Sequence, residues 1–388
     1  MSRNKLNGKC ITFVIPHSPG AVGYSSGKKL LSIASYHDYY CSIADENGAD
    51  VTLIYLDNKE PPNWDSSYNV ETRSITRGST FGSEFSLSLY QSLADTDSDI
   101  VHIHGYNQPN ILPALASLSL SRSKVVVQNH GSALDHSKIK HQVWHRFLMR
   151  VFSYTVDKII SVNETEIKNL INTGACSDYL VHLPNGVDMN RFYPLDQSKC
   201  RQSLSLTPSH RYLLFVGKIS PEKGVSYLLN ALGELPDDIH LLLVYSGTKE
   251  QELAKVNRII DQKGLENQVH FIGEVPQEKL AIYYNATDVC VFPSVNEGFG
   301  VVTLEAMACE TPVIATTEHA AGGHLDSGEN ALIAETKSAS SLAEKISKIF
   351  SSSDLQENIG RKGRKNVEKN YKWEQIGEKL TSVYEQIL

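Results

Sequence analysis

Short apolar runs recur along the chain, and longer segments with helically spaced apolar residues lie between them. The clearest runs cover residues 11–15, 51–55, 125–129, 241–245 and 289–292. Each run is short and almost continuously apolar, as strands covered on both faces of a parallel sheet are. Strands that alternate with helices in this order predict an α/β protein with doubly wound sheets.

The same alternation occurs in both halves of the chain, which predicts two domains. A chain of 388 residues is longer than one ordinary hydrophobic core requires. Asn185-Gly186 is a turn-forming pair, and the polar run over 196–210 reads as connecting structure. We therefore expect one Rossmann-like domain over 1–190, a second over 191–370, and an amphipathic terminal helix over 371–388.

Composition and charge narrow the possible classes of protein. The 41% hydrophobic and 21% charged residues are typical of a globular protein in water. A net charge of −7 argues against a nucleic-acid binder. The six cysteines are scattered without a metal or disulfide spacing, the first apolar run is too short for a signal peptide, and no segment could span a bilayer. We expect a cytoplasmic protein.

The stretch after the run at 289–292 combines a glycine turn with an apolar helix. Gly298 and Gly300 allow the chain to turn sharply, and the helix is expected to start near Phe299. The first N–H groups of a helix have no partner within the helix and carry partial positive charge. This helix start therefore suits a phosphate group.

Two carboxylates flank the same turn. Glu297 precedes the helix, and Glu305 lies eight positions later among apolar residues, about 12 Å away at a helical rise. A buried carboxylate is costly unless something pairs with it. The spacing suits a ligand with polar groups at both ends and a diphosphate between them, as in a nucleotide sugar. The alternative is that Glu305 pairs with a structural Arg or Lys and that Glu297 is a solvated loop residue.

The run from Phe292 to Thr316 resembles the Glu-x7-Glu signature of retaining glycosyltransferases of the family-4 type. The resemblance implies the GT-B fold, in which two Rossmann-like domains face each other across a cleft and the terminal helix crosses back to the first domain. It also implies that Glu297 contacts the donor sugar and that Glu305 binds the ribose hydroxyls. The backbone amides facing the donor would belong to Gly298, Phe299, Gly300 and Val301.

In the resembled family, an Arg and a Lys five positions apart grip the diphosphate of the donor. Here Lys218 stands where Arg is usual, and Lys223 matches the family. Lysine keeps the charge but lacks the bidentate fork of arginine. The alternative is that both are ordinary surface lysines.

A histidine after the run at 125–129 resembles the family's His-Gly feature, whose histidine contacts the donor sugar. His130 would take this role and join Glu297, Lys218 and Lys223 as a catalytic residue, although a histidine at the end of a strand is usually structural. His104 ends the strand expected before it, whereas His102 on the same face is expected under a helix. Further possible contacts are Gly20, Gly23 and Gly273.

The resemblance implies transfer of a sugar from a nucleotide diphosphate donor, most often a UDP-sugar, to a glycan, lipid-linked or small-molecule acceptor. Retention of configuration, a metal-independent reaction and no cofactor are implied with it. The alternating carboxylates from Asp95 to Asp99 could suggest a metal site, but they lie at the amino end of a strand, where a solvated turn is expected. Two alternatives remain: a nucleotide-sugar epimerase or hydrolase of the same fold, and a catalytically silent module that binds a nucleotide sugar or a partner enzyme.

The segment over 138–152 predicts a basic amphipathic helix that could lie on an anionic membrane. The alternative is that its apolar side packs on the first sheet. Its basic residues are Lys138, Lys140, Arg146 and Arg150. Its apolar side is expected to contain Ile139, Val143, Trp144, Phe147, Leu148 and Val151, and its polar side His141, Gln142 and His145.

Overall fold

The structure of the protein is a computed structural model that describes residues 4–19, 21, 26–33, 36–61, 66–77, 84–105, 110–131, 139–320 and 322–388. Gly20, Gly23 and Lys138, for which roles are predicted above, lie outside these ranges. The chain divides into two compact units. Unit 1 comprises Met1–Pro184 and Glu374–Leu388, and unit 2 comprises Asn185–Trp373.

Unit 1 contains a seven-stranded parallel sheet with the order β3-β2-β1-β6-β7-β8-β9. The strands expected from the apolar runs at 11–15, 51–55 and 125–129 are confirmed as β1, β2 and β7. The strand order reverses between β1 and β6, where ligands collect in open α/β sheets. The bounds are β1 Cys10–Ile15, β2 Asp50–Leu56, β3 Asn69–Arg73, β6 Ile100–His104, β7 Lys124–Asn129, β8 Lys158–Ser161 and β9 Leu180–His182, with a separate pair of β4 Thr76–Arg77 and β5 Glu84–Phe85.

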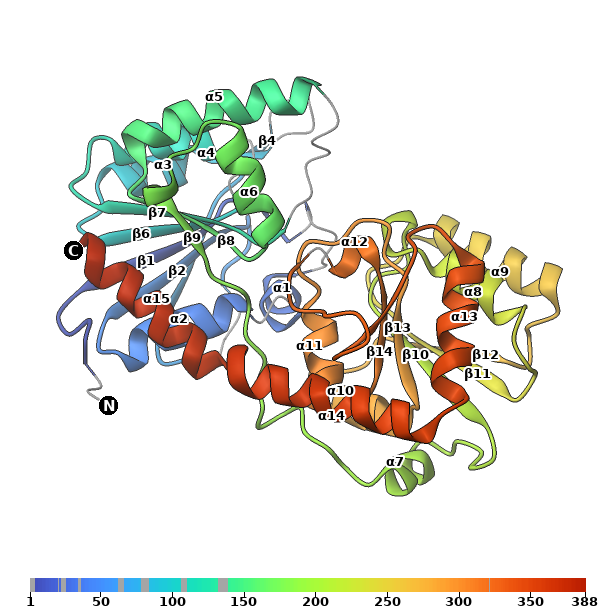
Figure 1. Ribbon diagram of the computed structural model, residues 1–388. Helices are drawn as coiled ribbons and strands as arrows, with labels where there is room; N and C mark the ends of the chain where they lie inside the picture. The colour runs from blue at the N-terminus through green and yellow to red at the C-terminus, as the bar shows by residue number, and fades with distance from the viewer. Residues whose placement is uncertain are drawn as a thin grey trace. The chain divides into compact units, whose positions relative to one another are not determined.

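Helices cover both faces of this sheet (Figure 1). Four of them, α3 to α6, bury apolar side chains against one face in a single core. The other face carries α2 and the terminal helix α15, whose Tyr384 Oη lies 2.7 Å from His102 Nδ1. The expectation that a helix covers His102 is thus confirmed. The bounds are α1 Gly27–Ile33, α2 Tyr36–Glu46, α3 Leu87–Ala94, α4 Ile111–Leu118, α5 Ile139–Thr155, α6 Glu164–Asn172, the 3₁₀ turn η2 Ser177–Tyr179 and α15 Trp373–Ile387.

Unit 2 contains a six-stranded parallel sheet with the order β12-β11-β10-β13-β14-β15. Its order reverses between β10 and β13, and the strands expected at 241–245 and 289–292 are confirmed as β11 and β13. The bounds are β10 Arg211–Val216, β11 Ile239–Val244, β12 Val269–Gly273, β13 Val289–Phe292, β14 Val313–Thr316 and β15 Leu332–Ala334.

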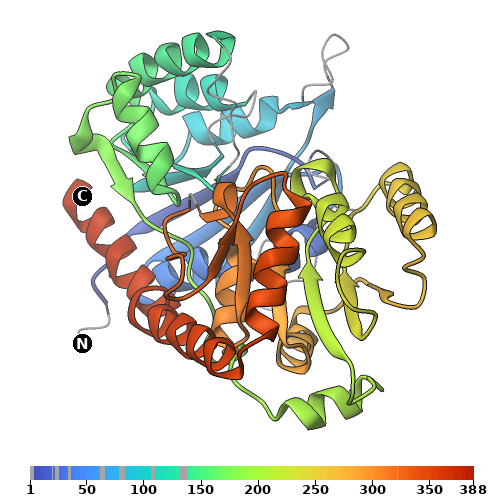
Figure 2. The ribbon, with the colours of Figure 1, turned by 45° about the vertical axis from the view of Figure 1, so that its right-hand side comes forward.

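The helices of unit 2 also form two layers around their sheet. Helices α8, α9 and α13 share one apolar core with the strands, and Figure 2 shows α8 and α9 adjacent from a second side. Helices α10, α11 and α14 lie on the other face. The bounds are α7 Gln197–Ser203, the 3₁₀ turn η3 Pro221–Lys223, α8 Val225–Leu232, α9 Glu250–Lys263, α10 Gln277–Ala286, α11 Val301–Ala308, α12 Thr317–Ala320, α13 Ala339–Phe350 and α14 Ser353–Asn370.

Two local expectations from the sequence are wrong. The polar run over 196–210 is not merely connecting structure, because Asp196 caps α7 by accepting from the Lys199 backbone N–H at 2.8 Å. Helix α11 begins at Val301 rather than near Phe299. Gly300 takes a left-handed φ of 79°, which is not helical, so the helix can begin only at the next residue.

Candidate active site

The loops that follow β10 and β13 touch each other at the point where the strand order of unit 2 reverses. The Glu222 carbonyl accepts hydrogen bonds from the backbone N–H groups of Val295 and Asn296, at 2.7 and 3.3 Å. Gly224 has a φ of 68°, and a Cβ at this position would lie 2.0 Å from the Pro293 carbonyl oxygen. Only glycine permits this approach, which brings Lys223 next to the loop that carries Glu297.

Glu297 is a largely buried carboxylate with two donors. Its Oε2 lies 2.6 Å from Lys223 Nζ and accepts from Ser294 Oγ at 3.0 Å, and its side chain is 11% exposed. Burial by itself would raise the pKa of Glu297, but the Lys223 ammonium and these hydrogen bonds outweigh it and lower the pKa to about 2. Glu297 is therefore ionised at neutral pH, and it is not the solvated residue of the alternative interpretation.

The two lysines of the η3 loop have different surroundings. Lys223 is partly buried against Glu297, whereas Lys218 is exposed near the carboxyl end of β10. The structure thus brings Lys223, but not Lys218, into contact with Glu297. An anion arriving at the loop would meet Lys223 only by competing with the Glu297 carboxylate.

Glu305 lies on α11 with its carboxylate turned toward α10. Its side chain is 5% exposed, and Tyr284 Oη donates to Oε2 at 2.7 Å. Burial raises the pKa of Glu305 to about 7, against the lowering effects of the Tyr284 hydrogen bond and the more distant charge of Arg191. Its hydrogen-bonding partner is a tyrosine, rather than the Arg or Lys of the alternative interpretation.

Two buried histidines after β14 complete the surroundings of the glycine turn. A Cβ on Gly300 would lie 2.1 Å from His319 Nε2, and His319 Nδ1 is 3.7 Å from Glu297 Oε2. His324 Nε2 pairs with Thr303 Oγ1 in the first turn of α11 at 2.6 Å. Burial lowers the pKa of His319 to about 4, so this imidazole is neutral at pH 7 and Lys223 supplies the positive charge beside Glu297.

Gly273 ends β12, the edge strand of the same sheet, with a φ of 77°. Its carbonyl accepts from the Tyr245 backbone N–H at 2.9 Å. Backbone groups at this strand end could meet a flat ring without any side chain being specific for it. The contact with a nucleobase that the sequence suggested for Gly273 stays a prediction.

In unit 1, the carboxyl ends of β6 and β7 bring two sequence-predicted histidines together. His104 Nδ1 and His130 Nε2 are 2.6 Å apart, and their rings stack with centroids separated by 4.9 Å. Helix α2 adds His37, whose ring meets that of His104 edge-on at 4.7 Å, and Tyr36, which stacks on His130 at 4.3 Å. Burial lowers the pKa of His37 and His104 well below the usual value, so both are neutral at pH 7.

Sequence reasoning missed five residues of these two groups. No motif or spacing in the sequence marks Tyr284 or Ser294 as a functional residue. His319 and His324 stand in a loop that departs from the Gly-Gly-x-x-Glu pattern usual in the resembled family, so the departure itself was a signal. His37 could be found only from the fold, because α2 is far from β6 and β7 along the chain.

The arrangement in unit 2 can bind a ligand that is anionic in its middle and rich in hydroxyl groups at its ends. Lys223 and the first N–H groups of α11 favour a diphosphate. Glu297 and Glu305 are acceptors on either side of that position. Across the part of the chain that the structure describes, no helix is both long and apolar enough to cross a membrane.

Comparisons with known proteins identify the family of the chain. A family model for "Glycosyl transferases group 1" matches residues 196–366, and one for "Glycosyltransferase Family 4" matches residues 42–191. D-inositol 3-phosphate glycosyltransferase 2 of Catenulispora acidiphila is 37% identical over 169 residues, which make up 41% of this chain and 40% of that relative. The match therefore spans less than half of the relative's length.

Two further proteins extend the comparison to most of the chain. The GDP-mannose-dependent monoacylated alpha-(1-6)-phosphatidylinositol monomannoside mannosyltransferase of Corynebacterium glutamicum is 27% identical over 72% of this chain and 74% of its own length. The crystal structure of HepE from Anabaena in complex with UDP-glucose has a TM-score of 0.77 at 18% identity, covering 97% of this chain and 99% of that one. With the two family models matching successive parts of the sequence and the fold shared, the chain belongs to the GT-B glycosyltransferases of the group 1 and family 4 type.

Proposed function

We propose that the protein transfers a sugar from a nucleotide diphosphate sugar to an acceptor hydroxyl, with retention of the anomeric configuration. The observation that carries this proposal is the Lys223–Glu297 ion pair beside the first turn of α11, with the buried Glu305 on the same helix. Glu305 would accept from the ribose hydroxyls, and Glu297 from the hydroxyls of the donor sugar. Because Glu297 has a pKa of about 2, it acts as an ionised acceptor and not as a proton donor.

Departure of the nucleoside diphosphate is the step that the site must assist. Negative charge develops on the diphosphate oxygens, and Lys223 and the amides of α11 would be fixed donors for it, with the exposed Lys218 adding positive charge. These groups can supply the positive charge that a divalent ion supplies in other enzymes, which supports a metal-independent transfer. The acceptor would attack the face from which the diphosphate leaves, as the family resemblance implies for a retaining enzyme, and His130 would contact the donor sugar.

Relatives support the nucleotide-sugar donor and leave its base and sugar open. The solved HepE complex holds UDP-glucose, whereas the mannosyltransferase of Corynebacterium glutamicum is named for GDP-mannose. A UDP-sugar is the first candidate for this chain because UDP-sugars are the most frequent donors in the resembled family. The contact with the base would come from backbone groups near Gly273, so no side chain at that strand end selects the base.

Thermal stabilisation by a panel of UDP-, GDP- and ADP-sugars tests the proposal. A donor at a hundred times its dissociation constant should add about 2.7 kcal/mol to the free energy of unfolding. The Glu305→Ala protein is the control, and the same donor concentration should raise its melting temperature clearly less than that of the native protein. Stabilisation of neither protein would count against a donor site. Turnover of the donor in the absence of any acceptor would favour the epimerase or hydrolase alternative.

The product of the reaction should keep the anomeric configuration of the donor. Once a donor and an acceptor are paired, proton NMR at an early time point should show the donor's anomeric configuration in the new linkage. The early measurement matters because later mutarotation or hydrolysis can mix the two anomers. An inverted product would remove both the retaining assignment and the role given to Glu297.

We also propose that unit 1 contacts an anionic membrane surface through α5, where a lipid-linked acceptor would be found. Leu148, Met149 and Phe152 of this helix are buried in the core of unit 1. Three other apolar residues expected on the same side are instead exposed: Val143 at 61%, Trp144 at 39% and Phe147 at 50%. The helix thus has a sheet-facing side and a second, exposed apolar side.

The expected position of His145 on this helix is wrong, and the side chains of two of the four expected basic residues lie outside the described part of the chain. His145, expected on the polar side, is fully buried because it lies on the sheet-facing side together with Leu148 and Met149. Lys138 is outside the described residues, as is the side chain of Lys140. Arg146 and Arg150 are exposed, and no ion pair joins either one to the residues that the structure describes.

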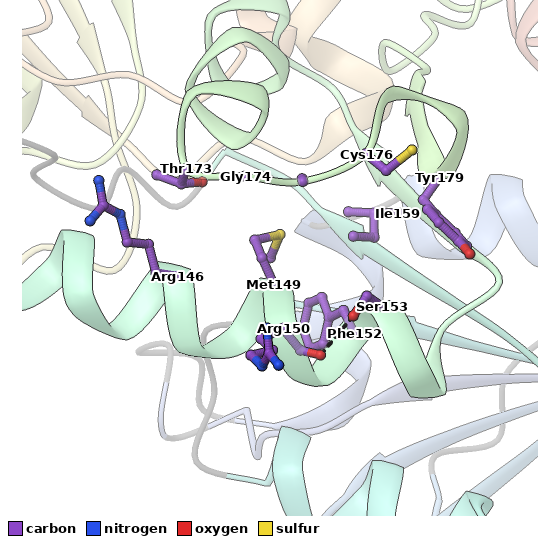
Figure 3. A pocket seen from close by; sticks show the side chains of 11 residues that line it. Arg146, Met149, Arg150, Phe152, Ser153, Ile159, Thr173, Gly174, Cys176 and Tyr179 are labelled. Carbon is purple, nitrogen blue, oxygen red and sulfur yellow. Dashed lines mark hydrogen bonds between the residues drawn. The ribbon is translucent and has the colours of Figure 1, made fainter.

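The two arginines also line a pocket of about 310 Å³. Figure 3 shows Arg146 and Met149 pointing from α5 toward the segment 173–176, with Ile159 of β8 on the side of Met149 away from Arg146. Positive charge beside an exposed apolar cluster is the combination by which interfacial helices bind anionic lipid. The acceptor of the Corynebacterium glutamicum relative, a phosphatidylinositol mannoside, is consistent with such a contact.

Vesicle flotation checks the membrane proposal. The protein should float with anionic vesicles at low salt, and Arg146→Glu with Arg150→Glu should abolish flotation, since each basic residue near the surface adds about 1 kcal/mol. Arg258→Glu, which reverses an exposed charge on α9 of unit 2, is the matched control and should float like the native protein. Absence of flotation at low salt would leave an acceptor free in water as the better hypothesis.

A further inference from the structure

Three histidines of unit 1 converge from separate elements. One nitrogen each of His37 on α2, His104 at the end of β6 and His130 after β7 lies within 4.8 Å of the others. His37 and His104 are buried, and His130 is partly exposed. Within the described part of the chain, His37 Nδ1 has no hydrogen-bond partner. Buried polar atoms are normally paired, so this cluster lacks something that would satisfy it.

The chemistry of the cluster suits a borderline divalent metal ion. Neutral imidazole is a good ligand for Zn²⁺, and three histidines with one open position form a recognised type of zinc site. Mg²⁺ and Ca²⁺ prefer oxygen ligands, so a site made of three imidazoles should discriminate against them. The partial exposure of His130 gives an ion access to a cluster that is otherwise enclosed.

Aromatic contacts hold two of the three rings in place. Tyr36 stacks on His130 at a centroid distance of 4.3 Å, and His102 stacks on His104 at 4.5 Å. His102 is in turn fixed by the hydroxyl of Tyr384 from α15. Ligand rings that are oriented by their neighbours lose little freedom when a metal binds.

The present geometry requires one small change before an ion can enter. His104 Nδ1 and His130 Nε2 share a hydrogen at 2.6 Å. Nitrogens bound about 2.0–2.1 Å from a tetrahedral Zn²⁺ lie roughly 3.3 Å apart, so the two rings must separate slightly. The ring that donates the shared hydrogen must carry it on its other nitrogen, so that both lone pairs face the ion. This is a change of tautomer, and no net proton is lost.

We propose that His37, His104 and His130 form a binding site for a zinc-type divalent cation, with a water molecule in the fourth position. The consequence for activity rests on the proposed function, because His130 is the histidine expected to contact the donor sugar. An ion that holds His130 would keep it from the sugar. Binding of the ion is therefore inhibitory, whereas the departure of the diphosphate proposed for the lysines and amides of unit 2 does not require it.

Light absorption by bound Co²⁺, measured on the 388-residue chain, tests the site without any measurement of activity. Titration with Co²⁺ should give visible bands of a four-coordinate ion that saturate near one equivalent. Zn²⁺ should remove the bands, and Mg²⁺ should not. His37→Ala should weaken Co²⁺ binding at least tenfold. His240→Ala is the matched control, because His240 belongs to another stack of histidines, with His210 and His270 in unit 2.

A second variant protects the test against a folding defect. His37→Gln keeps most of the side-chain volume, and circular dichroism should show that it folds. Weak Co²⁺ binding by this folded variant supports the site. The absence of cobalt bands from the native protein, or equal affinity in the His37 variants, would overturn it.

Measurements of the transfer rate with and without Zn²⁺ test the metal site separately from the proposed function. Zn²⁺ should lower the transfer rate of the native protein, and His37→Ala should lose less of its own zinc-free rate at the same concentration. Cobalt bands without zinc inhibition would overturn the role given to His130 in transfer and leave the metal site in place. Excess chelator should sustain or raise the native rate, whereas abolition of transfer by chelator would contradict the inhibitory role.

Discussion

Replacing Lys223 by alanine should lower kcat/KM for sugar transfer by roughly 10²–10³-fold, the cost of removing one fixed donor from a developing oxyanion. The reason is that Lys223 is the partly buried cation beside the first turn of α11. The same change leaves the Glu297 carboxylate without its ammonium partner, so unit 2 should also lose about 1–3 kcal/mol of stability. Initial rates and urea unfolding measure the two effects separately.

Two further variants separate folding from catalysis. The double change Lys223→Met with Glu297→Gln removes both charges and should recover most of the lost stability without recovering transfer. Lys218→Ala, on the exposed lysine of the same loop, should cost less than Lys223→Ala, and Lys218→Arg should be neutral or improving because arginine restores the fork. If Lys218→Arg abolished transfer in a folded protein, the loop would not hold a diphosphate as proposed.

Much of the fold could be predicted from the sequence, because buried parallel strands leave an unmistakable pattern. The run at 289–292 is a strand, and its loop and helix follow as expected. The start of α11 could not be placed correctly, since both Gly298 and Gly300 are compatible with a turn. Only the structure shows that Gly300 is left-handed and lies against His319, which follows the next strand of the sheet.

The candidate site also has residues that could be proposed from the sequence and neighbours that could not. Glu297, Glu305 and Lys223 could be proposed from the sequence because they belong to a continuous motif and a short loop. Their surroundings could not: Tyr284 reaches Glu305 from a different helix, and His37 meets His104 from another. Such pairs depend on how helices and strands pack together, which cannot be inferred from the hydrophobic periodicity or the motif spacing of the sequence. The burial of His145 on α5 has the same origin, because a helical wheel cannot tell which of two apolar sides faces the sheet.

Changing Glu305 to glutamine should weaken the nucleotide-sugar complex by about 1.5–3 kcal/mol, because a charged acceptor for the ribose hydroxyls is lost. The side chain keeps its size and can still accept from Tyr284, so the effect is on binding and not on packing. Glu305→Ala should show the same loss of affinity in calorimetry. Unchanged donor affinity in either variant would remove Glu305 from the proposed site.

Glu305→Gln should weaken donor binding but stabilise the free protein, and the gain in stability should depend on pH as the ionisation of Glu305 does. The pKa of Glu305 is raised from an ordinary 4.5 to about 7, so between these values the unfolded chain ionises first and the folded state loses stability as the pH rises. Without donor, Glu305→Gln should therefore melt like the native protein at pH 4.5 and at a higher temperature at pH 8. Donor affinity of the native protein should rise through pH 7 as the acceptor ionises, and that of Glu305→Gln should stay flat. A glutamine variant that melts below the native protein at pH 8 would show that Glu305 is already paired by a charge in the free protein.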